Sequence, residues 1–329
     1  MKRHHAPAPR ARQSGMTMIE TMVAMAISSI LILGAISVYN SARTNYRTAE
    51  NLARLQESLR FATDTLDEDI RLAGYWGRTN GNASWSRDAA ARVNCGTNDV
   101  TDWALGPVGS VIVGLDASDD AYDLPCPGNN PRANSDVVIV RHADTKQNVT
   151  AEANRIQVRT TGNTGHIFAD GVPPQDNNVG RTKVYDVDVN AYYVSNRSNY
   201  DNALPSLRRR SLVGTMMQDE EIIAGVENLQ VQFGIDRNGD DQVDGYVDDG
   251  HPDKRDDNVV SVRLWLLVRG DADETAQGYI DDNIYRTPDA DGFSIAPDAG
   301  VDYPDSYRRY AFTRTIVLGN AVPAEDRQP

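Results

Sequence analysis

An acidic cluster in the last third of the chain holds the residues best suited to bind a metal ion. It reads D-R-N-G-D-D-Q-V-D-G-Y, from Asp236 to Tyr246. The groups that would supply oxygen ligands alternate along it, as the side chains of Asp236, Asn238, Asp240 and Asp244 and the carbonyl of Gln242. Counted from Asp236, the four side chains occupy positions 1, 3, 5 and 9, and the Gln242 carbonyl occupies position 7. This alternation brings oxygens to one centre in calcium-binding loops. The spacing predicts a structural Ca²⁺ site.

Two positions depart from a full EF-hand loop. Asp241 stands where the sharp turn favours glycine, and Val247 stands where a bidentate glutamate would be. Asp248 or Asp249 would have to supply the missing carboxylate. Asp, Asn and Gly are also the residues of a tight hairpin, and residues 236–257 hold nine acids against three bases. A solvated acidic hairpin without metal is therefore the alternative.

The sequence contains two cysteines, Cys95 and Cys126. In an exported domain a disulfide between them would persist. It would close a loop of about 30 residues and contribute roughly 3 to 4 kcal/mol to stability in the chain-entropy model. Two free, buried thiols are the alternative.

The histidines show no spacing typical of a catalytic centre. His142, His166 and His251 match no nucleophile or zinc pattern. The 329-residue chain has a net charge of −14, which argues against nucleic acid because phosphate binding needs a basic surface. We therefore expect neither catalysis nor a nucleic-acid partner. A membrane-tethered hydrolase is the alternative, which substitution of one of these histidines would test.

An apolar segment near the amino terminus organises the rest of the chain. The 24 residues from Met16 to Tyr39 contain one formal charge, Glu20. As a helix they span about 36 Å, enough to cross the hydrocarbon core of a bilayer. A carboxylate in such a segment costs roughly 2.5 to 3.5 kcal/mol, so Glu20 needs a partner. The segment itself contains no basic residue.

Basic residues precede this segment and acids dominate beyond it, so the positive-inside tendency places the leader in the cytoplasm and the bulk outside. The leader holds four of the 33 basic residues and no acid, so its removal would leave a net charge of −18. An ordinary secretory signal has a shorter apolar run, followed by its cleavage site. A plain signal anchor would leave Glu20 unexplained.

The order of a short basic leader, Gly15, Met16 and then Glu20 resembles the type IV pilins and pseudopilins. The resemblance implies cleavage by prepilin peptidase between Gly15 and Met16, with methylation of the new amino terminus. Glu20 becomes the fifth mature residue, and by resemblance it meets the terminal amine of a neighbouring subunit during assembly. Met16 replaces the more common Phe, a tolerated substitution.

Beyond Tyr39 the helical pattern continues, and no proline occurs between Pro9 and Pro107. We predict a helix from Met16 to about Leu72, about 85 Å long, with an apolar stripe in its second half. The stripe consists of Leu52, Leu55, Leu59, Ala62, Leu66, Ile70 and Ala73.

After the helix, the sequence is typical of strands, which are rich in β-branched residues or alternate apolar with polar residues. The predicted strands are Val108 to Leu115, Val137 to His142, Arg155 to Thr160, Val184 to Val194, Leu207 to Val213, Leu229 to Ile235, Val259 to Val268 and Ala311 to Leu318. We expect an α+β fold, in which a mainly antiparallel sheet packs on the helix stripe.

Two further phrases resemble PilW-type minor pilins and, more distantly, GspJ-like pseudopilins. The first is R-L-A-G-Y-W-G from Arg71 to Gly77, in which Gly74 is expected to end the helix and Trp76 to pack in the core. The second, from Glu220 to Asp236, contains G-V-E-N-L, and a closing strand follows at Arg309 to Leu318. Residues 80–200 match no motif.

The expected domains are a cleaved leader (1–15), a membrane or assembly segment (16–39), an amphipathic half-helix (40–73), a periplasmic β-rich domain (74–322) and a tail (323–329). The resemblance implies a minor pilin, held in the inner membrane and then incorporated in the complex that primes pilus assembly and sits at the tip. Its expected partners are the prepilin peptidase, other minor pilins and the major pilin through the helix, with a large tip adhesin as a further candidate. The alternatives are a GspJ-like pseudopilin of type II secretion and a Ca²⁺-dependent adhesin with a pilin-like anchor.

Overall fold

The computed structural model describes residues 15–79, 83–106, 112–115, 125–126, 129–146, 149–174, 182–255, 258–288, 293–300 and 302–320. It divides into two compact units, Met1–Glu50 and Asn51–Pro329. The expected leader, up to residue 14, and the expected tail lie outside the described residues.

The long helix α1 extends from Met18 to Leu72. Thr17 caps its amino-terminal end, because the Glu20 N–H donates to Thr17 Oγ1 at 3.3 Å. At the other end Gly74 has a φ of 75°, in the left-handed region where glycine commonly ends helices. Its N–H donates to the Arg141 carbonyl at 3.2 Å, which directs the chain toward the sheet. The predicted long helix and its glycine exit are confirmed.

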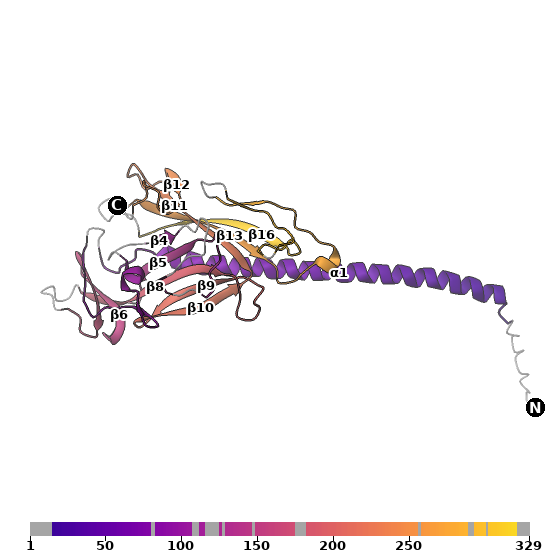
Figure 1. Cartoon of the computed structure of the whole chain (residues 1–329), viewed down its shortest axis with the longest axis horizontal. Helices are drawn as coiled ribbons and strands as arrows, with labels where there is room; N and C mark the ends of the chain where they lie inside the picture. Colours follow the sequence, from indigo (N-terminus) through magenta and orange to yellow (C-terminus); the bar gives the residue numbers. More distant parts are fainter. Residues whose placement is uncertain are drawn as a thin grey trace, which may run out of the picture. The chain divides into compact units, whose positions relative to one another are not determined.

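From residue 84 onward, most of the described secondary-structure elements are strands (Figure 1). The strands are β1 (Ser84–Arg87), β2 (Asn94–Cys95), β3 (Asn98–Asp99), β4 (Ile112–Leu115), β5 (Val137–Ala143), β6 (Ala153–Thr160), β7 (Thr164–Asp170), β8 (Lys183–Ser195), β9 (Ser206–Val213), β10 (Met216–Ala224), β11 (Val226–Ile235), β12 (Gly245–Val247), β13 (Val259–Arg269), β14 (Tyr285–Arg286), β15 (Ser294–Ile295) and β16 (Arg309–Val317). Two short helices, α2 (Thr101–Leu105) and η1 (Thr275–Gln277), accompany them.

The described strands form a ten-stranded, a four-stranded and a two-stranded sheet. The large sheet has the order β1-β7-β6-β8-β9-β10-β2-β3, and the pair β4-β5 joins it through β8. The second sheet has the order β12-β11-β13-β16. Strand pairing is antiparallel except for β1 with β7 and β10 with β2. The fold is therefore α+β with mostly antiparallel sheets, as predicted.

Strand β10 was absent from the prediction, because its sequence M-M-Q-D-E-E-I-I-A carries three acids in succession. Its register explains them, since Asp219, Glu220 and Glu221 lie opposite the three arginines of β9. Opposite charges on facing cross-strand positions stabilise a strand pair. A charged segment thus forms a strand because its partner strand has the complementary charges.

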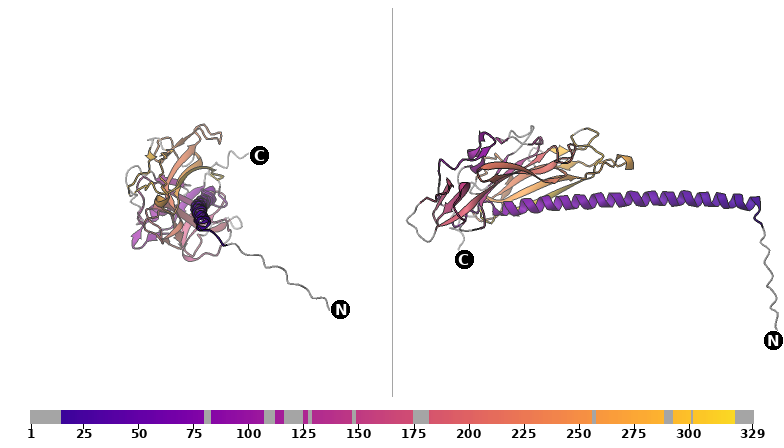
Figure 2. Two further views of the ribbon diagram at one scale, coloured as in Figure 1. Left: turned by 90° about the vertical axis from the view of Figure 1, so that its right-hand side faces the viewer. Right: turned by 90° about the horizontal axis from the view of Figure 1, so that it is seen from below.

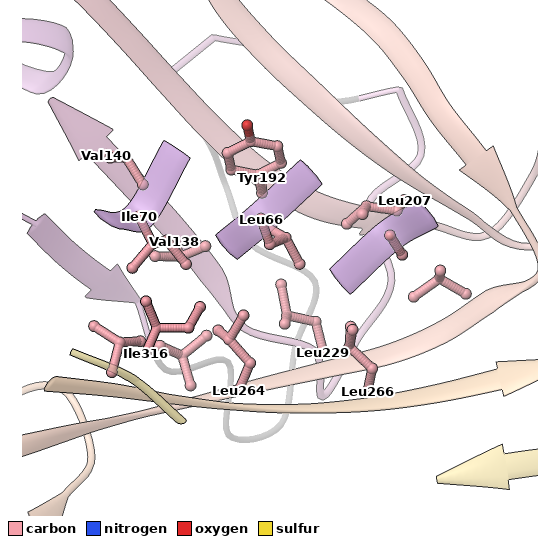
Figure 3. Packing of buried hydrophobic residues seen from close by; sticks show 14 of the residues in the cluster. Leu66, Ile70, Val138, Val140, Tyr192, Leu207, Leu229, Leu264, Leu266 and Ile316 are labelled. Carbon is pink, nitrogen blue, oxygen red and sulfur yellow. The ribbon is translucent and has the colours of Figure 1, made fainter. Parts of the chain in front are cut away.

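The second part of α1 packs against strands of both larger sheets (Figures 2 and 3). Leu66 and Ile70 lie between Tyr192 of the large sheet and Leu264 and Ile316 of the smaller sheet (Figure 3). The helix stripe therefore fills a core shared by the two sheets. The prediction was wrong for Leu52, which is 42% exposed and is not part of this core.

A second apolar core lies on the other face of the large sheet. Along β8, Tyr192 and Val194 face the helix, whereas Ala191 and Tyr193 face this second core, as expected when successive side chains alternate. Trp76 is 5% exposed here, and its ring lies edge-on to Trp85 with centroids 5.2 Å apart. Its predicted packing role is confirmed.

Candidate functional site

The amino-terminal end of α1 presents an apolar surface with one acidic residue. Met16 is 69% exposed, and the apolar side chains from there to Tyr39 are all exposed within the described protein. The segment is apolar and long enough to cross a membrane. So large an uncovered apolar surface requires lipid or other helices as neighbours.

Glu20 lies in the first turn of α1, four residues after Met16. A carboxylate at this end interacts favourably with the partial positive charge of the helix terminus. The pattern Thr17-x-x-Glu20 is the signature of a capping box, a signal that is readable in the sequence. Glu20 therefore lies at the positive end of its own helix, close in sequence to the bond between Gly15 and Met16.

The glutamate of the G-V-E-N-L phrase is the centre of a buried ion network. Glu227 is fully buried and contacts Arg269 at 3.3 Å and Arg309 at 2.5 Å. Arg309 also contacts Asp281 at 3.1 Å, and both of these side chains are fully buried. The network therefore connects β11, β13, β16 and the segment between the last two strands.

The backbone explains why Glu227 points into this network. The register of β11 with β13 shifts between Val226 and Asn228, so Glu227 is the extra residue of a β-bulge. Gly225, immediately before, has a φ of 95°, and a Cβ there would lie 2.8 Å from the Arg269 carbonyl oxygen. Gly225 thus permits the close approach of the two backbones, and the bulge that follows it directs Glu227 into the network.

Burial and charge act in opposite directions on the two arginines. Burial alone would lower the pKa of Arg309, but its bonds to Glu227 and Asp281 outweigh this and raise the pKa. Burial lowers the pKa of Arg269 despite the nearby charge of Glu227. An uncompensated charge at this place would be costly, so the network fixes the positions of its strands.

A second set of polar contacts connects the segment after β13 to α1. Arg54 Nη1 lies 3.3 Å from Asp271 Oδ2, and Asn51 Nδ2 donates to Glu274 Oε1 at 3.1 Å. Arg308 Nε, next to β16, contacts the same Glu274 carboxylate at 3.0 and 2.9 Å. Polar contacts thus hold α1 at residues 51–54, beyond the end of its apolar stripe.

The predicted disulfide between Cys95 and Cys126 is present, so the alternative of free thiols was wrong. It belongs to the second core, and Arg210 Nη1 lies 3.0 Å from Cys126 Sγ. The bridge therefore connects the β2 hairpin to the chain that leads toward β5.

The acidic loop predicted to bind Ca²⁺ follows β11. Asp236 accepts backbone N–H groups from Asn238 at 3.0 Å, Gly239 at 2.7 Å and Asp241 at 2.7 Å. Burial would raise the pKa of Asp236, but these bonds lower it. Asp241 has a φ of 62°, at the position where the turn favours glycine. The loop is closed by its own backbone.

The other predicted ligands also accept bonds from within the loop. Asn238 Oδ1 accepts from the Asp240 N–H, Asp240 Oδ1 from the Gln242 N–H, and Asp244 Oδ2 from the Arg237 N–H. In the described part of the chain, no group of three or more His, Cys, Asp or Glu side chains is arranged to hold a metal ion. Calcium binding at this loop stays a prediction.

Removal of calcium tests that prediction. If Ca²⁺ clamps the loop, EGTA should lower the melting temperature of the protein, because binding to the folded state alone adds stability by mass action. Differential scanning calorimetry with and without EGTA measures the shift, and Asp240→Asn should abolish it. An unchanged melting temperature would leave the loop as a self-sufficient acidic hairpin.

The histidines occupy two kinds of site. His142 is buried between α1 and the large sheet, 2.8 Å from Asp69. His166 Nδ1 lies 2.6 Å from Ser86 Oγ and its Nε2 lies 2.8 Å from Asp88. Ser86 and His166 are register partners in neighbouring parallel strands, which accounts for their contact.

Two regions of the chain match the models of known protein families. Residues 10–36 match the prokaryotic N-terminal methylation motif, and residues 191–320 match the family described as Type IV Pilus-assembly protein W. A type IV-like pilin from Thermus thermophilus is similar in structure, with 12% sequence identity and a TM-score of 0.36 over 82% of this chain and 98% of that one. No curated protein matches significantly.

The chain shares the methylation motif, and the apolar helix that starts after Gly15, with the type IV pilins. Within that class, the match over residues 191–320 supports a PilW-type pilin with a prepilin leader. The matched region begins in β8 and ends after β16, so it includes the whole Glu227 network.

Proposed function

We propose that the protein is a minor pilin, incorporated with other minor pilins in the complex that primes pilus assembly and located at the pilus tip. The observation that carries the proposal is Glu20, the one charge on an exposed apolar helix surface, at the fifth position after Gly15. A plain anchor does not need a charge at that position, whereas pairing with a neighbour's amino terminus would make it a register signal.

The proposal assigns three roles to different parts of the chain. The apolar surface of α1 supplies affinity for lipid before assembly and for other pilin helices afterwards. Glu20 sets the axial position of the subunit, and the β-rich unit, held in the periplasm before assembly, selects its neighbours. The match to Type IV Pilus-assembly protein W favours a role in the pilus over type II secretion.

Deletion of the gene tests this function with two readouts. We expect cells without the protein to lose surface fibres and not only attachment, because a priming subunit acts before elongation. Mass spectrometry of the complemented protein should find a mature chain that begins with N-methylated Met16. Normal fibres with impaired attachment would instead indicate an adhesin, and a chain that retains its leader would contradict processing at Gly15.

A further inference from the structure

His142 is a buried histidine at the point where α1 ends on the large sheet. Its side chain is 5% exposed, and its Nε2 lies 2.8 Å from Oδ1 of Asp69, on α1. Asn190 of β8 donates to the same Asp69 oxygen at 3.1 Å. Three elements, α1, β5 and β8, therefore meet at one carboxylate oxygen of Asp69.

Both ring nitrogens of His142 face groups that accept hydrogen bonds. Nδ1 lies 2.9 Å from the Ala143 carbonyl oxygen, and Nε2 faces the Asp69 carboxylate. A carbonyl oxygen cannot donate, so Nδ1 carries a proton; an ionised carboxylate cannot donate either, so Nε2 also carries one.

The contact coincides with the helix exit. The Ala143 N–H donates to the Tyr75 carbonyl at 2.6 Å, and the Gly74 N–H donates to the Arg141 carbonyl at 3.2 Å. Loss of one His142 proton would remove the imidazole N–H from either the Asp69 carboxylate, which would keep only the Asn190 amide as a donor, or the Ala143 carbonyl, and losing a hydrogen bond in a buried place is unfavourable.

We infer that the His142–Asp69 pair is a pH-sensitive latch, which fastens the last turns of α1 to β5 while the imidazole is doubly protonated and weakens when it loses a proton.

The surroundings favour the cation. The titratable and charged groups around the pair are Asp69 of α1, Asp144 after β5, Arg155 of β6, Asp186, Asp188 and Tyr192 of β8, and Arg209 of β9. Asp188 Oδ2 lies 3.9 Å from His142 Nδ1, while Arg155 is engaged by Asp186 at 2.8 Å. Burial and the charge of Asp69 raise the pKa of Tyr192, so its hydroxyl is neutral at physiological pH.

The direction of the pH effect follows from the pair. Burial would lower the pKa of His142, but the bond to Asp69, the charges of Asp69 and Asp188, and the Ala143 carbonyl together raise it. A pKa raised by folding gives stability that is fully present below the unfolded-state value of about 6.5. This stability is lost as the pH rises through the folded-state pKa, and in that window the unfolding equilibrium constant increases about tenfold per pH unit.

Nitrogen-15 NMR of the full-length, histidine-labelled protein in detergent micelles tests the protonation state directly. Above the ordinary histidine pKa, at pH 7, we expect both His142 nitrogens to give imidazolium-type shifts, assigned by the loss of these signals in His142→Gln. A neutral ring with one unprotonated nitrogen, found in the folded wild-type protein at pH 7, would overturn the inference.

Chemical denaturation of the same protein from pH 5.5 to 8.5 tests the latch. We expect the wild-type unfolding constant to increase with pH above about 6.5, and His142→Gln to lose this one-proton dependence. His166→Gln is the matched control, because it removes a histidine–aspartate contact elsewhere in the large sheet and leaves the His142–Asp69 pair in place. Equal pH dependence in the wild type and His142→Gln would refute the latch.

Discussion

Glu227→Gln is expected to destabilise the protein by roughly 3 to 5 kcal/mol, the usual effect of removing one partner from a buried charge network. Arg269 and Arg309 would then share a buried site with only Asp281 as a counter-charge. Denaturant unfolding of the full-length protein in micelles, followed by tryptophan fluorescence, measures the change in the free energy of unfolding.

Glu220→Gln is the matched control for that experiment. Glu220 also pairs with an arginine, Arg209, but its side chain is 48% exposed, so its loss should cost less than about 1 kcal/mol. If the two variants lost the same stability, the network would not be the element that fixes the strands around the G-V-E-N-L phrase.

The second large effect concerns assembly. Glu20→Ala should leave the β-rich unit folded but reduce incorporation into fibres by about two orders of magnitude. An unpaired carboxylate in an apolar segment costs roughly 2.5 to 3.5 kcal/mol, and pairing on assembly removes that cost. Alanine has no such cost to relieve, so the variant loses this driving force. Quantitative immunoblotting of sheared fibres against whole-cell protein measures incorporation.

Glu68→Ala serves as the control on the same helix, because Glu68 is exposed and lies outside the apolar segment. It should incorporate like the wild type. Normal incorporation of Glu20→Ala, with its amino terminus processed at Met16, would argue against the register role of Glu20.

The sequence predicted those parts of the fold that depend on local pattern. The long helix, its glycine exit and strands such as β8 and β13 follow from periodicity that a single segment contains. The acidic strand β10 could not be predicted in this way, because its charges become favourable only beside the arginines of β9. Leu52 fits the helical stripe, yet it is 42% exposed and lies outside the core cluster, so periodicity alone misplaced it.

The candidate site divides in the same way. Gly15, Met16 and Glu20 are neighbours in sequence, so their spacing was readable, and the methylation motif match covers them. The role of Glu227 could not be read from the sequence, because its partners Arg269 and Arg309 lie 42 and 82 residues away. His142 and Asp69 are likewise 73 residues apart, and only the fold brings them together. The family resemblance drew attention to the G-V-E-N-L phrase, and the buried ion pairs of Glu227 explain its role.

The placement of Leu66 and Ile70 between two sheets has a mechanical consequence (Figure 3). A tensile force along the helix axis would have to shear apolar contacts on two opposite sides at once, together with the polar ties at residues 51 and 54. Extraction of this rod should therefore be abrupt and require high force, whereas a helix held on one side could peel away turn by turn.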